Sequence, residues 1–375
     1  MQAYTRNNPA YASKLKEERE LTEDKDLALR PTRVTAAVGE MYLSRHWQGI
    51  PGIECAGNGR LWAAFYSGGE EEGPDNYVAL VTSGDEGRTW SDVLYAVDPP
   101  GLVRAYDPCL WHDPSGRLWL FWAQSYGWYD GRCGVFAATC DSSGDASLVW
   151  SEPRRIADGI MMNKPTVLVN GDWLLPIAVW ACESSGLNDL PEERFSNVWH
   201  SADQGKTFRK LGHADIPNRS FDEHMIVERK DGSLWMLVRA FYGIGESVSQ
   251  DGGKTWTPGR QSPLGGPDSR FYIGRLRSGR LLLVNHYQYR RRSHLTAMLS
   301  EDEGRSWTGH LLLDERSHVS YPDVVQAEDG RIFIIYDHER SKAKEILLAI
   351  VTEADILNGS LVSEQSVLKQ LVNKA

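Results

Sequence analysis

Ser83-Gly84-Asp85-Glu86-Gly87-Arg88-Thr89-Trp90 is an octapeptide that the chain carries in four close copies. The other three begin at Ser201, Ser249 and Ser300, and a degenerate copy runs from Asp141 to Trp150. The Asp carboxylate of such a segment can accept hydrogen bonds from its own turn, and the Gly allows a positive φ. The Thr or Ser hydroxyl can close the turn, and the aromatic residue packs back on the sheet. The octapeptide therefore predicts a β-hairpin, and we assign it no catalytic role.

A second repeat surrounds the first. Six short polar turns, each with a glycine, precede strands of large apolar residues such as Leu61–Phe65 and Leu234–Val238. The turn glycines are Gly59, Gly116, Gly171, Gly232, Gly279 and Gly330. Their spacing of roughly fifty residues is in the range of propeller blades. We therefore predict an all-β fold, a six-bladed β-propeller of four-stranded antiparallel blades, with the octapeptides between the third and fourth strands.

The N-terminal segment differs from the rest of the chain. It is polar and charged, and Tyr11 to Leu29 has a helix-forming composition that ends before Pro31. We expect residues 1–33 to form an arm or a short helix, and residues 34–375 to form a single propeller domain. A strand near Val34 to Glu40 is expected to pair with the last blade and so to close the ring.

Composition narrows the classes of partner. The formal net charge of −10 argues against nucleic acid, and no apolar run is long enough to cross a membrane. Residues Met1 to Asn8 contain no apolar signal core, and the five cysteines are odd in number and lack metal-binding spacing. We therefore expect a cytoplasmic protein with reduced thiols and with no metal or cofactor.

The repeat also predicts a site. Because the innermost strands of all blades face a common channel, equivalent positions should face the same axis. The residue nine positions before each turn glycine is Ile50, Asp107, Glu223, Arg270 or Tyr321, and Lys164 is the equivalent in the third repeat. Four of these six residues precede a proline, which supports the register. Since five of the six are polar or ionisable, we predict a binding site at one end of the channel.

A second ring of candidates follows the second strand of each repeat. Tyr66, Arg239, His286 and Asp337 stand seven residues after their turn glycines. Arg239 ends an apolar strand, where a charge is costly unless it meets a carboxylate or a ligand. The basic cluster Arg290–Arg292 comes soon after His286, and we expect at least one of its arginines to turn toward the channel.

The octapeptide is the Asp-box, or bacterial neuraminidase repeat. With the six-fold strand repeat, it makes residues 40–350 resemble the sialidase superfamily of six-bladed propellers. The resemblance implies a nucleophilic Tyr activated by a Glu, an Asp that acts as acid and base, and three arginines that bind the substrate carboxylate. On this resemblance, Tyr321 is the nucleophile, Glu223 its base, Arg239 the second arginine and Arg291 the third.

Two positions depart from the family pattern. The Arg-Ile-Pro triplet that supplies the first arginine reads Gly49-Ile50-Pro51 here. The catalytic Asp would follow the strand that ends near Tyr66, where a longer loop contains Glu70, Glu71, Glu72 and Asp75. The acid is therefore either Asp107 or a residue of this loop. Loss of one bidentate arginine contact predicts roughly ten- to a hundredfold weaker binding of sialic acid, unless Arg270 compensates.

The leading hypothesis is an exo-acting glycoside hydrolase for a terminal acidic sugar, with an anionic carbohydrate as its expected partner. Its predicted catalytic residues are Tyr321, Glu223 and Asp107, and its predicted substrate-binding residues are Arg239, Arg270, Arg291, Lys164, His286 and Tyr66. Two alternatives stay open. One is an elimination enzyme acting on a uronic acid, with Tyr321 and His286 as base and acid. The other is a carbohydrate-binding propeller without turnover.

Overall fold

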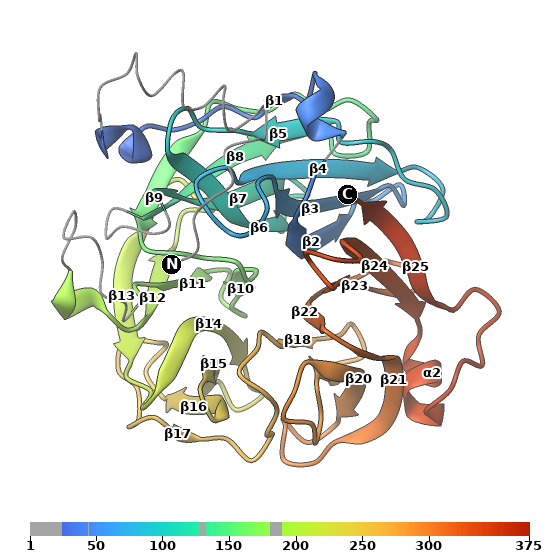
Figure 1. The fold of residues 1–375 in the computed structure, drawn as a ribbon. Helices are drawn as coiled ribbons and strands as arrows, with labels where there is room; N and C mark the ends of the chain where they lie inside the picture. Colours follow the sequence, from blue (N-terminus) through green and yellow to red (C-terminus); the bar gives the residue numbers. More distant parts are fainter. Residues whose placement is uncertain (1–24, 44, 128–132, 181–189) are drawn as a thin grey trace.

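The computed structural model describes residues 25–43, 45–127, 133–180 and 190–375. Six antiparallel sheets are arranged in a ring, which confirms the predicted six-bladed propeller (Figure 1). Blade 1 contains β2 (Gln48–Cys55), β3 (Leu61–Ser67), β4 (Tyr77–Ser83) and β5 (Tyr95–Val97), with the short β1 (Thr35–Ala36) added at its outer edge. Blade 2 contains β6 (Val103–His112), β7 (Leu118–Tyr126), β8 (Gly134–Cys140) and β9 (Arg154–Asp158). Blade 3 contains β10 (Thr166–Val167), β11 (Trp173–Ala178), β12 (Ser196–Ser201) and β13 (Arg209–Ala214).

The remaining blades follow in chain order. Blade 4 contains β14 (Arg219–Glu228), β15 (Leu234–Ala240), β16 (Gly243–Ser249) and β17 (Arg260–Gln261). Blade 5 contains β18 (Tyr272–Arg275), β19 (Leu281–Asn285), β20 (Ser293–Ser300) and β21 (Thr308–Ser317). Blade 6 contains β22 (Val319–Gln326), β23 (Ile332–His338), β24 (Glu345–Val351) and β25 (Val367–Lys374). The second strands are buried along their whole length, except at Tyr126 of β7, because each blade packs face to face between two neighbours.

The octapeptides form the predicted turns between third and fourth strands. In the first copy, the Thr89 hydroxyl donates to Asp85 Oδ2 at 2.6 Å and the Thr89 amide donates to Asp85 Oδ1 at 2.9 Å. The Ser83 hydroxyl donates to the same carboxylate at 2.7 Å, and the Trp90 indole donates to the Gly87 carbonyl. These bonds hold the pKa of Asp85 down at about 2. The octapeptide is therefore a self-contained structural turn at the outer part of the blade.

Four of the innermost strands share one irregularity. In β2, β6, β14 and β22, three steps along the strand oppose only two steps of the neighbouring strand, which is a β-bulge. A residue with left-handed backbone stands in each bulge: Ile50, Asp107, Glu223 and Tyr321, with φ of 57°, 49°, 42° and 56°. In blades 3 and 5 the innermost strands begin only after Lys164 and Arg270, and their pairing is regular. The six equivalent positions therefore have two different backbone settings.

The ring closes differently from the prediction. Thr35 of β1 pairs with Ala96 of β5 within blade 1, so the predicted pairing of Val34–Glu40 with the last blade is wrong. The outer strand of blade 6 is β25, from the C-terminal part of the chain. Instead, blades 1 and 6 meet side by side (Figure 1). Gln48 joins them. Its backbone N–H donates to the Arg340 carbonyl at 3.1 Å, and its side-chain Nε2 donates to the Lys344 carbonyl at 2.6 Å.

The described part of the N-terminal segment rests on blade 2. It begins with a short 3-10 helix, η1 (Lys25–Leu29), whose end is held by Gln124 through its bonds to the carbonyls of Ala28 and Arg30. Residues 1–24 of the predicted arm or helix lie outside the described residues. The other helical turns are η2 (Glu40–Tyr42), η3 (Pro191–Glu193) and α2 (Glu353–Asn358).

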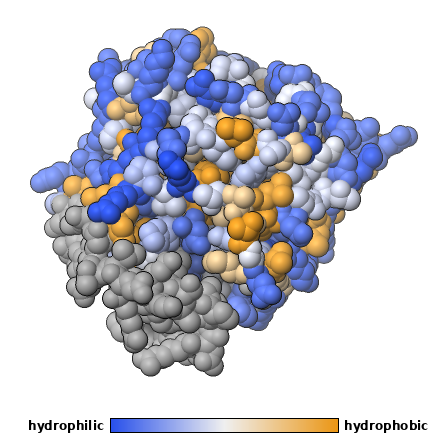
Figure 2. All heavy atoms as spheres, turned by 90° about the horizontal axis from the view of Figure 1, so that it is seen from above, coloured by the Kyte–Doolittle hydropathy of each residue, from blue (hydrophilic) through white to orange (hydrophobic). Residues whose placement is uncertain are grey.

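The outer surface on the side of β1 and β5 is mainly polar, with apolar side chains in several separate places (Figure 2). Exposed apolar side chains of the first two blades and the segment before them include Leu29, Val38, Leu43 and Val149. In the described part of the chain, helices are too short or too polar to span a lipid bilayer.

Candidate active site

The four bulges open into a pocket of about 180 Å³ at one end of the channel. Its described lining is Ile50, Tyr66, Glu72, Arg104, Tyr106, Asp107, Met162, Trp180, Phe221, Glu223, Arg239, Arg292, Tyr321 and Arg340. The four bulge residues Ile50, Asp107, Glu223 and Tyr321 therefore all line the pocket. Four arginines and three carboxylates share this small volume, and the aromatic and aliphatic side chains complete its walls. No group of three or more His, Cys, Asp or Glu side chains among the described residues is placed to share a metal ion.

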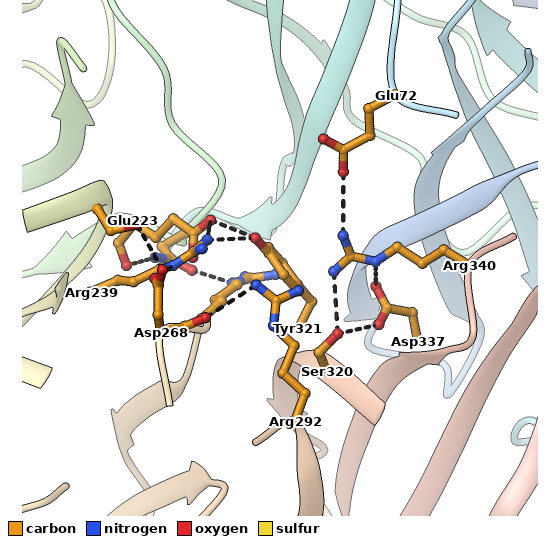
Figure 3. Close-up of polar contacts among 12 residues, drawn as sticks. Glu72, Glu223, Arg239, Asp268, Arg292, Ser320, Tyr321, Asp337 and Arg340 are labelled. Atoms are coloured by element: carbon orange, nitrogen blue, oxygen red, sulfur yellow. Dashed lines mark hydrogen bonds and ion pairs between the residues drawn. The ribbon is translucent and has the colours of Figure 1, made fainter. Parts of the chain in front are cut away.

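Tyr321 and Glu223 meet across the channel, from blades 6 and 4 (Figure 3). The Tyr321 hydroxyl donates to Glu223 Oε1 at 2.7 Å, and both residues are buried. Burial raises the pKa of Tyr321 to about 12, against the opposing influence of the Arg239 charge. The phenol is therefore protonated at neutral pH, and the Glu223 carboxylate is the base within hydrogen-bond reach of its proton. The predicted contact between these two residues is present.

Arg239 holds this pair in place. It is the last residue but one of β15, and its Nη1 donates to Glu223 Oε1 at 2.6 Å and to the Tyr321 hydroxyl at 2.8 Å. Its Nε donates to Asp268 Oδ1 at 2.5 Å. The buried guanidinium near the end of this apolar strand is therefore paired with two carboxylates, those of Glu223 and Asp268, as its burial requires.

Asp107 is a buried carboxyl group on the blade 2 side of the pocket. Burial, with Glu72 as a second cause, raises the pKa of Asp107 to about 8. It is therefore a neutral acid at pH 7. Glu72 belongs to the loop between β3 and β4, and its Oε1 accepts a hydrogen bond from Arg340 Nη1 at 3.3 Å. Both sources of the acid that the sequence left open, Asp107 and the loop of residues 70–75, reach the pocket.

Arg270 was predicted to bind substrate, but it lies beneath the pocket and does not line it. Its side chain is buried, and its three nitrogens donate to Asn163 Oδ1 and to the carbonyls of Met162 and Pro51. The guanidinium is thus used to join blades 1, 3 and 5. It does not supply the missing arm of the carboxylate clamp.

Lys164 and His286 are also outside the pocket lining. Lys164 Nζ donates to Glu54 Oε1 at 2.6 Å and lines a separate cavity of about 700 Å³, formed by the other ends of the innermost strands. His286 is buried with its Nε2 bonded to the Val319 carbonyl at 2.7 Å, and burial lowers its pKa to about 4. Tyr66, in contrast, does line the pocket, where its ring packs against Trp47.

The basic cluster contributes a different arginine from the one predicted. Arg291 is exposed and lies outside the lining, whereas the neighbouring Arg292 lines the pocket. The Arg292 guanidinium carbon lies 5.3 Å from the centroid of the Tyr321 ring, and its Nη2 donates to the Asp268 carbonyl. Successive residues of a loop point in different directions, so a shift of one residue moves the charge out of the site.

Two further arginines of the pocket were not predicted. Arg104 precedes Asp107 on β6, and its guanidinium carbon is 3.8 Å from the Tyr106 ring centroid. Arg340 follows Asp337 by three residues, in the turn between β23 and β24, and its guanidinium carbon is 4.3 Å from the Tyr321 ring centroid. Both lie outside the two repeat positions used for prediction. The only sequence signal was their closeness to Asp107 and Asp337, which those positions had identified.

The family model for BNR repeat-like domains matches residues 59–334. The chain belongs to the family of BNR repeat-like domain proteins. No curated protein matches this BNR-repeat protein by sequence. Among solved structures, it is similar to the Hadza microbial sialidase Hz136, with a TM-score of 0.61 and 19% identity over 78% of this chain and 63% of that chain.

Two other solved structures match the BNR-repeat protein over most of both chains. The intramolecular trans-sialidase from Ruminococcus gnavus has a TM-score of 0.63 and 14% identity, over 87% of this chain and 98% of that chain. A Dyadobacter fermentans protein of unknown function has a TM-score of 0.63 and 18% identity, over 84% and 95%. At these identities the structures show a shared fold.

Proposed function

We propose that this BNR-repeat protein is a glycoside hydrolase that removes a terminal acidic sugar through a covalent intermediate on Tyr321. The observation that carries the proposal is the 2.7 Å hydrogen bond from the buried Tyr321 hydroxyl to Glu223, in a pocket rich in arginine. A tyrosine is a weak nucleophile at its ordinary pKa and needs a base within reach, and Glu223 meets that need.

Proton transfers balance over two steps. In the first, the Tyr321 oxygen attacks the anomeric carbon while Glu223 takes the phenol proton and Asp107 protonates the departing glycosidic oxygen. In the second, the Asp107 carboxylate takes a proton from water as that water attacks the anomeric carbon. The bond to Tyr321 breaks in the same displacement, and Glu223 returns its proton to the phenolate oxygen. Two displacements at one carbon retain the anomeric configuration.

An acidic substrate explains why the nucleophile is a tyrosine. A carboxylate on the anomeric carbon would repel an Asp or Glu nucleophile, whereas a neutral phenol can approach it. The arginines around Tyr321 give the pocket a positive potential on a chain whose net charge is negative. The volume of about 180 Å³ is small beside the roughly 300–1,000 Å³ of most ligand pockets. It favours a single sugar at a chain end.

The acid predicted for the elimination mechanism, His286, is not in the pocket. His286 is buried, is bonded through Nε2 to the Val319 carbonyl and lies outside the pocket lining. The pKa of its imidazole, lowered to about 4, leaves it neutral where such an enzyme needs an acid. The hydrolase is therefore favoured over a uronate lyase.

The direct test is release of 4-methylumbelliferone from its glycosides with N-acetylneuraminic acid and with glucuronic acid, with the neutral glucoside as the matched control. We expect release from an acidic glycoside only, and a first-formed sugar of retained configuration by NMR. Mass spectrometry of protein quenched during turnover should detect a sugar on Tyr321. An unsaturated uronate absorbing in the ultraviolet, or binding of either acid without release, would overturn the proposal.

A further inference from the structure

Gly49 occupies the position where the family triplet has its first arginine. Its backbone is outside the left-handed region, so its conformation does not require glycine. Space does require it. A Cβ at this position would lie 2.7 Å from Arg340 Cδ and 2.8 Å from Arg340 Cγ, closer than Cβ contacts are found. The side chain of Arg340 therefore runs through the volume that a side chain at position 49 would enter.

Arg340 is held firmly in that volume (Figure 3). Its Nε donates to Asp337 Oδ2 at 2.8 Å and its Nη2 to the Ser320 hydroxyl at 3.2 Å. Asp337 is fully buried and also accepts hydrogen bonds from the Ile50 amide and the Ser320 hydroxyl. One carboxylate thus fixes Arg340 against the innermost strands of blades 1 and 6, with the guanidinium beside the Tyr321 ring.

The remaining nitrogen of Arg340 is directed toward Glu72 (Figure 3). The distance from Nη1 to Glu72 Oε1 is 3.3 Å, longer than the other polar contacts of this guanidinium. The loop that carries Glu72 is ordered by Asn76, whose side chain accepts from the Gly73 amide at 2.7 Å and donates to the Gly68 carbonyl at 2.9 Å. The pocket therefore places a carboxylate of its own on the open side of Arg340.

We infer that Arg340 binds the substrate carboxylate in place of an arginine at position 49, and that Glu72 is the counter-ion that the substrate displaces. This inference rests on the proposed function for its substrate class. Arg239 and Arg340 are each paired with two protein carboxylates, and the contact of Arg340 with Glu72 is the longest of the four. On this reading, the missing Arg-Ile-Pro arginine does not weaken binding of an acidic sugar. The same charge arrives from the last blade.

The test measures binding, so that it does not depend on turnover. Calorimetry would compare 2,3-didehydro-N-acetylneuraminic acid with its methyl ester, and glucuronic acid with its methyl ester, for the whole chain and its variants. Arg340→Ala should weaken binding of the acid by roughly ten- to a hundredfold, the value of one charge-assisted contact, and weaken the ester far less. Arg331→Ala is the matched control, because Arg331 is a similarly buried, ion-paired arginine of blade 6 outside the pocket.

An exchange variant separates a binding role from a structural one. Gly49→Arg combined with Arg340→Ala should recover about tenfold of the lost affinity for the acid, because it returns an arginine from the other side. Should this variant not fold, the single variant and its control decide. Glu72→Gln should strengthen binding of the acid, since it removes the competing carboxylate, and weaker binding would overturn the counter-ion role.

The two proposals fail separately. Arg340→Ala that changes acid and ester equally, or changes neither, overturns this inference even if the protein hydrolyses acidic glycosides. Binding of the acid through Arg340 without any release of aglycone refutes the hydrolase and leaves this inference standing. A wild-type chain that binds neither acid overturns both the inference and its substrate class.

Discussion

The innermost strands of blades 1, 2, 4 and 6 differ from those of blades 3 and 5 at one repeat position. In the first group a bulge places the residue in left-handed backbone, and Ile50, Asp107, Glu223 and Tyr321 line the pocket. In the second group the strand begins later, and Lys164 and Arg270 lie within the channel, bonded to other blades. The repeat register therefore predicts which residue lies near the axis. The local backbone determines whether that residue lines the pocket or lies beneath it, bonded to other blades.

The bulged position carries an energetic cost. A residue other than glycine with positive φ is strained by about 1–3 kcal/mol, and such strain is retained where the surrounding structure fixes it. With Phe221, whose φ is 57°, five such residues line a pocket of about 180 Å³, which is a concentration of strain at the site of proposed chemistry. The regular strands of blades 3 and 5 carry no such strain at this position and use their charges to join blades.

The largest expected effect is at the bulge of blade 6. Tyr321→Phe should lower kcat for an acidic aryl glycoside by more than about 10³-fold, because no oxygen remains to form the covalent intermediate. Affinity for the 2,3-dehydro acid should change little. Tyr272→Phe is the matched control from regular blade 5, since Tyr272 lies outside the pocket lining, and it should keep full turnover. Equal turnover in the two variants would contradict the division between the strands.

Asp107 of blade 2 should show the next effect. Asp107→Asn should slow hydrolysis about 10²- to 10⁴-fold for poor leaving groups, which need a proton, and less for umbelliferone. Because Asp107 must be protonated in the first step and its pKa is raised to about 8, kcat/KM should fall as pH rises through about 8. Glu72→Gln measured on the same substrates tells the two carboxylates apart. If the fall of kcat/KM at alkaline pH disappears in Glu72→Gln instead, the acid is Glu72.

Arg270 of blade 5 should affect stability instead of catalysis. Arg270→Met removes a buried cation that donates to three protein oxygens and lies 3.6 Å from Asp323. We expect a loss of about 3 kcal/mol in the free energy of unfolding. The folded variant should keep its KM for an acidic glycoside. Denaturant unfolding with steady-state kinetics on one preparation checks both halves, and a raised KM with unchanged stability would contradict the placement of Arg270.

A smaller effect concerns stability and pH. The folded pKa of Asp107 is raised from 3.8 to about 8, so the native state holds a proton that the unfolded state has lost. The contribution of this proton to the free energy of unfolding is therefore fully present below about pH 4 and is lost as pH rises through about 8. The stability of Asp107→Asn should not depend on this titration. The melting temperature of the variant should therefore rise relative to that of the wild type as pH increases. A constant difference from pH 5 to pH 9 would contradict the raised pKa.

The repeats were enough to predict the blades, and their register, together with the resemblance to sialidases, predicted the Tyr321–Glu223 pair. They could not predict that β18 begins after Arg270, because the turn glycines do not specify where pairing starts. They also missed Arg340 and Arg104, since neither stands at a repeated position. The ring closure was wrong for a related reason. A strand pattern such as that near Val34 does not identify its partner, which is β5 of blade 1.

The junction of blades 1 and 6 has a consequence for the order of assembly. Asp107 and Glu72 are synthesised early, whereas Tyr321 and Arg340 belong to the last blade, whose outer strand ends at Lys374. Among the described residues no strand passes from blade 1 to blade 6, so the pocket forms only when the sixth blade has been synthesised and docks against the first. Glu72 therefore stays apart from Arg340 during translation, and Glu223 stays apart from Tyr321. These groups meet as the sixth blade docks, when Arg340 reaches the carboxylate of Glu72.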